Sequence, residues 1–224
     1  SFLSDYDFIS LGCYCATAYA LQLLDLRKNS YPFDWTRSPL QGILHSVNVG
    51  FEDFLTCAGY RDTDQNRIFL GANWGGSFWH HNIYDPKAQE EMGRRASRFL
   101  GHGDVPPETA RVFVRVVNNT FELTQAEQLR QSLKMALPYA RDILLLLLVE
   151  LQEENSPMMV TSPEGEGIIV YTFASQDYQE APEQDRNPLA LTGARYSEAI
   201  AAAIRIWSGE SMAVRIYSSF MQLS

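Results

Sequence analysis

The chain has 224 residues, of which 46% are hydrophobic and 20% are charged, and its formal net charge is -9. This length suits one large domain with a substantial core, and the composition is that of an ordinary globular protein. The acidic balance argues against a nucleic-acid or anionic-membrane surface, because both need clusters of Lys and Arg. The longest apolar run, over residues 143–149, is far too short to span a bilayer. We therefore expect a single domain over 1–224 with neither nucleic acid nor membrane as a partner.

Two of the three cysteines, Cys13 and Cys15, are separated by one residue, and the third is Cys57. An odd number in this arrangement makes a poor disulfide framework and favours a reducing compartment. A lone C-x-C also lacks the second pair and the histidine spacing of a zinc site. We expect no metal and no other cofactor. A cytoplasmic location is expected, with secretion as an effector as the alternative.

Residues 1–105 form a half that carries the cysteines and histidines and is mostly helical in its patterning. Ser38 is the predicted N-cap of a helix, and Pro39 takes the first helical position after it. The predicted elements of this half are, in chain order, a strand over 8–11, a helix over 14–27, a helix from Pro39 to about Gly50, a short strand over 67–70 and a helix after Pro86.

Residues 106–224 alternate between strand and helix patterns. A capping box, Thr124 to Glu127, predicts the start of one helix that continues to about Leu137. The remaining predicted elements are strands over 112–117, 143–149, 167–174 and 212–217 and a helix over 196–207. This alternation is typical of an α/β (or α+β) fold with a mixed, partly parallel sheet.

The first strand is followed at once by Cys13 and Cys15 at the start of a helix. Amide N–H groups and the helix dipole favour a negative charge there, which is where a thiolate nucleophile would be placed. Catalysis by a thiolate needs an imidazole nearby. A buried free cysteine that acts as a small apolar residue is the alternative reading, and spacing alone leaves Cys13 and Cys15 equivalent.

The imidazole candidates are His80 and His81, which follow Trp79 and precede Asn82. This setting combines aromatic side chains with nearby polar groups, although a purely structural role fits it equally well. Asp34 lies between two aromatic residues, and a buried carboxylate there must be hydrogen-bonded or functional.

Five blocks of the sequence together resemble a bacterial family described as "putative papain-like cysteine peptidases", a domain of unknown function. Members carry S-L-G-x-x-C, L-R-x-x-S-x-P-F-D-W, an aromatic–His–Asp step, R-R-x-x-R-F and F-V-R. The chain has these patterns, in the same order, at 10–15, 26–35, 78–82, 94–99 and 112–115. The P-F-D-W block is the most specific, because no general rule of folding requires it.

The resemblance implies a cysteine-dependent hydrolase or acyl transferase, such as a peptidase or deamidase, that acts on a protein or peptide-like substrate. Its nucleophile falls on Cys15 and its histidine on His81. Asn82 stands where the family has the acid of its His–Asp step, so either Asn82 or Asp34 would orient the imidazole. Ser10 and the amides around Gly12–Cys15 would support the oxyanion if the thiol lies at a helix start. Substrate binding is assigned to Trp35, Trp79, His80 and Arg94.

Two other functions are compatible with the sequence. The first is an α/β enzyme for nucleotide-sugar or phosphate substrates, which would use the arginines of segment 94–98 and Arg115. The absence of a glycine-rich phosphate loop argues against it. The second is a catalytically inactive interaction or effector domain. In that case the acidic segment 150–186, with nine carboxylates against Arg186 alone, would bind a partner.

Overall fold

The computed structural model describes residues 1–152, 155–160, 167–174, 188–212 and 215–217. Of the nine carboxylates in the acidic segment, only Glu150 falls within these ranges. The predicted docking surface on that segment therefore lies almost wholly outside the described residues.

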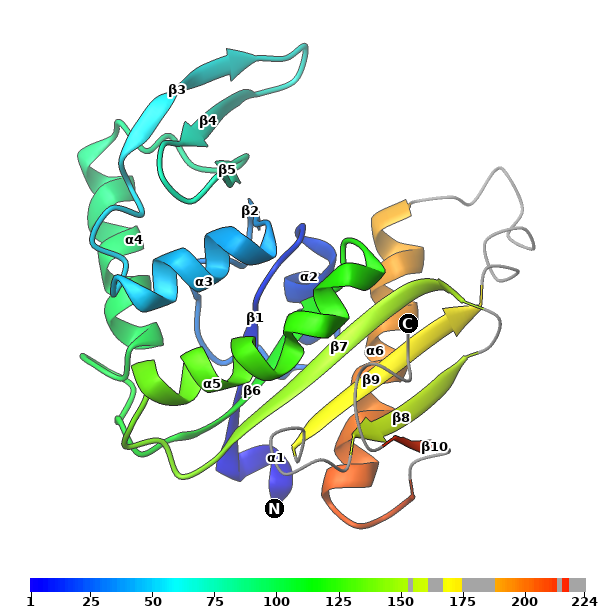
Figure 1. Ribbon diagram of the computed structural model, residues 1–224. Coiled ribbons are helices and arrows are strands. Elements are labelled where there is room, and N and C mark those ends of the chain that lie inside the picture. The colour runs from blue at the N-terminus through cyan, green and yellow to red at the C-terminus, as the bar shows by residue number, and fades with distance from the viewer. Residues whose placement is uncertain (153–154, 161–166, 175–187, 213–214, 218–224) are drawn as a thin grey trace.

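The main sheet has six strands within the described residues, in the order β1-β6-β7-β9-β8-β10 (Figure 1). The strands β1, β6, β7 and β9 are parallel to one another, β8 is antiparallel to β9, and β10 is parallel to β8. Their bounds are β1 Tyr6–Ser10, β6 Ala110–Val116, β7 Ile143–Gln152, β8 Ser156–Val160, β9 Ile168–Ala174 and β10 Arg215–Tyr217. This mixed, mostly parallel sheet confirms the predicted fold class.

The first and second halves of the chain meet in this sheet. Every residue of β1 pairs with a residue of β6, so the division at 105/106 runs between two neighbouring strands. Strand β7 is buried on both faces over residues 143–149, which explains its continuous apolar run.

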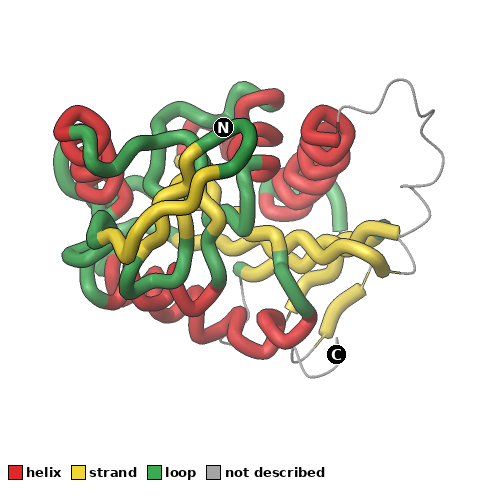
Figure 2. Tube along the Cα trace, turned by 90° about the horizontal axis from the view of Figure 1, so that it is seen from above, coloured by secondary structure: helices red, strands yellow, loops and turns green. Residues whose placement is uncertain are grey.

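Helices cover both faces of the sheet (Figure 2). Their bounds are α1 Phe2–Asp5, α2 Ala16–Leu23, α3 Leu40–Asn48, α4 Pro86–Phe99, α5 Ala126–Ala136 and α6 Pro188–Trp207. Alternate side chains of each strand point to opposite faces. Phe8 and Val112 therefore pack with α2 and α6, whereas Ile9 and Phe113 pack with α3 and α5.

A smaller antiparallel sheet has the order β2-β5-β4-β3, and its β3–β4 hairpin projects from the body of the molecule in Figure 1. Its strands are β2 Thr36–Arg37, β3 Cys57–Asp62, β4 Arg67–Gly71 and β5 Ser77–Phe78. Thr36 pairs with Phe78 and Arg37 with Ser77. This short pairing brings the segment after P-F-D-W beside the segment that leads to His80.

The structure corrects some predicted helix ends. Helix α2 ends at Leu23 rather than near residue 27, because Asp25 adopts a left-handed conformation (φ 56°) and the Leu26 N–H bonds back to the Leu21 carbonyl. Helix α6 begins at Pro188, before the expected start at Tyr196. Strand β8 and the short α1 were not predicted.

The predicted helix caps were wrong. A 3-10 helix, η1 (Thr120–Gln125), precedes α5, and the Thr124 hydroxyl bonds to the Phe121 carbonyl instead of forming a capping box. The N-cap of α3 is Pro39 rather than Ser38, whose hydroxyl bonds elsewhere.

Within the described ranges, no helix has both the length and the apolar character that crossing a membrane requires.

Candidate active site

The turn that carries the cysteines is sharply bent. Gly12 (φ 70°) and Cys13 (φ 79°) both lie in the left-handed region between β1 and α2. The Gly12 N–H donates to Ser10 Oγ at 3.1 Å, and a Cβ on Gly12 would lie 2.1 Å from Ser38 Oγ. A left-handed conformation at a residue other than glycine costs energy and is concentrated at functional sites. The strained backbone at Cys13 is therefore one indication of a functional site.

Buried polar side chains hold this turn in place. Ser38 Oγ accepts from the Cys13 N–H at 3.2 Å and donates to the Leu11 carbonyl at 3.2 Å. The Arg115 guanidinium donates to the carbonyls of Leu11 (3.2 Å) and Ser38 (2.7 Å). Its other two nitrogens bond to the Glu122 carboxylate at 3.1 and 3.0 Å, and both side chains are buried. The two carbonyl bonds of Arg115 tie β6 to the cysteine turn and to the loop before α3, and its ion pair with Glu122 ties β6 to η1.

Cys15 is the N-cap residue of α2, and no side chain caps this helix. The amides of the first turn of a helix have no acceptor within the helix, and the dipole favours negative charge there. Burial raises the pKa of the Cys15 thiol, against the opposing effects of its own backbone N–H and of Arg37. The thiol therefore keeps its proton at neutral pH, and nucleophilic attack needs a base.

Cys15 and His80 line the same cavity, which has a volume of about 190 Å³. Its wall includes Trp35 and Trp79, and we call it the tryptophan cavity. The His80 ring meets the edge of the Trp35 ring at 5.8 Å between centroids. The β2–β5 pairing accounts for this meeting of two distant segments. A cysteine at a helix start and a histidine from a distant segment thus line one small, aromatic cavity.

His81 lies in the wall of a second cavity, of about 690 Å³, which the loop at 62–67 also lines and to which Trp79 and His80 contribute as well. Its Nδ1 is buried and has no hydrogen-bond partner among the described residues. Burial lowers the pKa of the imidazole, and the nearby Arg95 guanidinium lowers it further. The structure does not bring His81 into the wall that holds Cys15, and its role as the base stays a prediction.

Neither candidate for the third group bonds to a histidine within the described residues. Asn82 Oδ1 accepts from the Tyr84 N–H at 3.1 Å. The Asp34 carboxylate is buried and accepts from Arg27 at 3.0 and 2.8 Å and from the Tyr31 N–H at 2.9 Å. Asp34 thus fixes the P-F-D-W loop, and that loop carries Trp35 into the tryptophan cavity.

The other predicted site residues fall into three positions. Trp35, Trp79 and His80 line the tryptophan cavity, and their role in substrate binding stays a prediction. Arg94 lies on the exposed side of α4, where it pairs with Glu90 at 2.7 Å. Ser10 and Gly12 are buried beneath the turn.

The amides of Gly12 and Cys13 donate to Ser10 Oγ and Ser38 Oγ. The role of the amides around Gly12–Cys15 as oxyanion donors stays a prediction.

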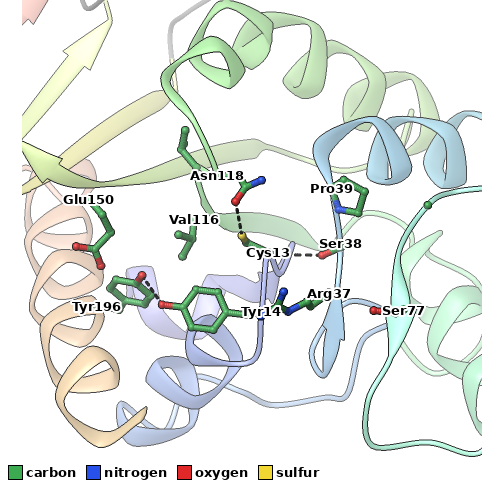
Figure 3. A pocket seen from close by; sticks show the side chains of 12 residues that line it. Cys13, Tyr14, Arg37, Ser38, Pro39, Ser77, Val116, Asn118, Glu150 and Tyr196 are labelled. Carbon is green, nitrogen blue, oxygen red and sulfur yellow. Dashed lines mark hydrogen bonds between the residues drawn. The ribbon is translucent and has the colours of Figure 1, made fainter. Parts of the chain in front are cut away.

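A third cavity, of about 450 Å³, lies over the carboxyl ends of β1, β6 and β7 (Figure 3). We call it the polar cavity. Cys13 Sγ donates there to Asn118 Oδ1 at 3.8 Å, and the hydroxyls of Tyr14 and Tyr196 are 2.9 Å apart. Helices α2 and α5, which follow β1 and β6, cover opposite faces of the sheet, and ligands of such sheets bind at this switch point. Asn118 comes directly after one predicted strand and Cys13 two residues after another, a signal that could have located the cavity.

Arginines proposed for phosphate binding are engaged with carboxylates instead. On α4, Arg95 pairs with Glu91, and Arg98 pairs with Asp104 at 2.9 Å. Together with the Arg94–Glu90 and Arg115–Glu122 pairs, these contacts give the arginines structural roles. Among the described residues, no group of three or more His, Cys, Asp or Glu side chains is arranged to hold a metal ion.

Comparison with known proteins places the chain in a family. An uncharacterized protein, R408, of Acanthamoeba polyphaga mimivirus is 48% identical over 52 residues, which are 23% of this chain and 23% of that protein. The chain thus matches about a quarter of the length of this curated relative. No solved structure gives a significant match. Residues 6–142, more than half of the chain, match the sequence model of one protein family. The protein therefore belongs to the family described as "Putative papain-like cysteine peptidase (DUF1796)".

Proposed function

We propose that the protein is a cysteine-dependent hydrolase or acyl transferase in which Cys15 is the nucleophile and His80 is the general base. One observation carries this proposal: the thiol at the uncapped start of α2 and the His80 imidazole line one cavity. Membership of a family described as papain-like supports thiol chemistry. The earlier assignment of the base to His81 is kept as the alternative that the experiment below separates.

The chemistry begins with a neutral thiol, because burial raises the pKa of Cys15. As Cys15 Sγ attacks the carbonyl carbon, its proton passes to the His80 imidazole and the carbonyl oxygen becomes an oxyanion. Amides of the first turn of α2 are the donors that can stabilise this oxyanion. The imidazolium then gives its proton to the leaving amine as the carbon–nitrogen bond breaks, which leaves a thioester on Cys15.

The second half of the reaction decides between hydrolysis and transfer. Water, deprotonated by His80, attacks the thioester and releases a carboxylic acid, or an amine attacks and forms a new amide. The indole rings of Trp35 and Trp79 offer apolar walls to the part of the substrate that enters the tryptophan cavity. A protein or peptide-like substrate fits this chemistry.

The acyl-enzyme can be tested without knowledge of the natural substrate. p-Nitrophenyl acetate transfers its acetyl group to an activated thiol and releases nitrophenolate. We expect an acetyl thioester on Cys15, found by peptide mass mapping, and none there in Cys15→Ala. The matched control Cys13→Ala should still be acetylated at Cys15.

Paired histidine variants identify the base. The acetylation rate should fall by about 100-fold in His80→Gln, the lower end of the usual general-base effect, and should be unchanged in His81→Gln. The reverse result would assign the base to His81. Equal acetylation of Cys13, Cys15 and Cys57 would contradict the proposal and would favour an inactive interaction domain.

A further inference from the structure

Arg37 differs from the arginines of this chain that pair with a carboxylate. It is exposed, and within the described residues it forms no ion pair. Seven other arginines each pair with a carboxylate: Arg27, Arg67, Arg94, Arg95, Arg98, Arg115 and Arg195. In a chain with a net charge of -9, a guanidinium left without a carboxylate partner beside two cysteines calls for an explanation.

Arg37 also lies where the two cavities meet. It lines both the polar cavity and the tryptophan cavity, as does Tyr14. Figure 3 shows it beside Tyr14 and next to Ser38 in the wall of the polar cavity. Its charge lowers the pKa of the Cys13 thiol and of the Cys15 thiol, so it is within electrostatic reach of both sulfurs.

The side chain is oriented by its surroundings. The Arg37 guanidinium lies over the Trp79 ring, 5.0 Å from the ring centroid. Its backbone is fixed by the pairing with Ser77 in β2–β5. The carboxylate of Glu150, on the polar-cavity wall, already pairs with Arg195 at 3.3 Å. Arg37 is thus held in position with its charge available to a ligand.

We propose that Arg37 binds a carboxylate of the substrate, and that the enzyme acts on acyl compounds that carry a carboxylate close to the carbonyl attacked by Cys15. The planar guanidinium matches a carboxylate with two parallel hydrogen bonds. Ser38, Ser77 and Asn118 line the polar cavity beside it and offer further polar contacts. In a peptide, the carboxylate belongs either to the C-terminus or to an Asp or Glu side chain. This inference rests on the proposed function for the position of the carbonyl.

The charge at Arg37 can be measured with two alkylating reagents of nearly equal size. Iodoacetate is an anion and iodoacetamide is neutral; with both, the thiolate forms a sulfur–carbon bond and iodide leaves. The ratio of their rate constants at one thiol reports attraction of the anion. A change in thiol pKa affects both reagents equally and cancels in the ratio.

We expect the iodoacetate/iodoacetamide ratio at Cys15 to fall about fivefold in Arg37→Gln, the size of one exposed charge–charge interaction. Arg37→Lys should keep most of the ratio. The matched control is Arg61→Gln, which removes an exposed arginine of β3 that lines neither cavity, and its ratio should equal that of the wild type.

The iodoacetate/iodoacetamide ratio is also measured at Cys13, because Arg37 lines both the polar cavity of Cys13 and the tryptophan cavity of Cys15. An unchanged ratio at both thiols in Arg37→Gln would overturn the inference. Failure of the proposed function gives a different result, namely no acetyl thioester on Cys15. The urea unfolding transition of Arg37→Gln, which should match that of the wild type, shows whether the variant keeps its fold.

A protection assay separates the two sources of carboxylate. Three short acetylated peptides are compared as protectants of Cys15 against iodoacetamide: one with a free C-terminus, one with an amidated C-terminus, and one amidated with an internal glutamate. We expect protection by one or both carboxylate-bearing peptides in the wild type, and its loss in Arg37→Gln. Equal protection by the uncharged peptide, or stronger protection by inorganic phosphate than by either carboxylate, would overturn the assignment to a carboxylate.

Discussion

The cysteine turn at residues 11–15 and the histidine segment at residues 79–82 both contribute to the tryptophan cavity, but they are held in different ways. Buried hydrogen bonds from Ser38 and Arg115 fix the cysteine turn. The histidine segment is held near the surface, by the Trp79 indole N–H bond to Ser77 at 2.9 Å and by the ring contact between His80 and Trp35.

This difference separates stability from reactivity. A buried polar network loses several kcal/mol when one member is removed, whereas an exposed aromatic contact contributes about 1 kcal/mol. Substitutions beneath the cysteine turn should therefore unfold the protein more easily. Substitutions around the histidine segment should instead lower the reactivity of Cys15 while the fold persists.

The largest expected effect is that of Arg115→Met. It leaves the Glu122 carboxylate buried without its partner and removes the bonds to Leu11 and Ser38. We expect the free energy of unfolding in urea to fall by about 4 kcal/mol. Arg94→Met, which breaks an exposed pair, should change it by less than about 0.5 kcal/mol. Equal effects of the two substitutions would remove the distinction between the two regions.

The next effect is that of Gly12→Ala. The new methyl group would overlap Ser38 Oγ, and alanine would have to adopt the left-handed backbone conformation of Gly12. We expect a loss of about 3 kcal/mol in the free energy of unfolding, from the contact and the conformation together. Gly50→Ala is the matched control, because Gly50 is also left-handed (φ 61°) but has open space around it. Its loss should be about 1 kcal/mol. Similar losses would mean that Ser38 does not constrain the turn.

The smallest effect tests the histidine segment. Trp35→Leu removes the ring contact of His80, and Trp35 is only half-buried. We expect the free energy of unfolding to change by about 1 kcal/mol or less, while acetylation of Cys15 slows roughly fivefold. The control Tyr139→Leu replaces another exposed aromatic residue, away from both cavities, and should leave the rate unchanged. A large loss of stability with an unchanged rate would reverse the roles of the two regions.

Much of the fold could be predicted from local patterns. The continuous apolar run at 143–149 indicated a central strand, and the segment after Pro86 indicated a helix; both formed as expected. The antiparallel sheet was mostly missed, because β2 and β5 have two residues each and exist only through pairing between distant segments. Ser38 has the sequence of a helix cap, and only the tertiary structure turns its hydroxyl toward the cysteine turn.

The site could be predicted in part. The cysteine at the start of a helix was found from the strand and glycine before it, but the choice between His80 and His81 had no basis in spacing. Both histidines line the cavity beside the loop at 62–67, and only His80 also lines the cavity of Cys15, a difference that depends on the tertiary structure. Arginine within a mostly apolar strand was a signal of a buried polar contact, but the partners of Arg115, Glu122 and the Ser38 carbonyl, could not be read from the pattern.

The pH dependence of iodoacetamide alkylation at Cys15 tests the thiol–imidazole pair most directly. Burial raises the pKa of this thiol, so without a base the thiolate fraction falls about tenfold for each pH unit below that pKa. We predict that the wild type and His81→Ala keep their reactivity at neutral pH. His80→Ala should react at least about tenfold more slowly there and should recover only at alkaline pH. Superimposable profiles of His80→Ala and the wild type would contradict the assignment of His80 as the base.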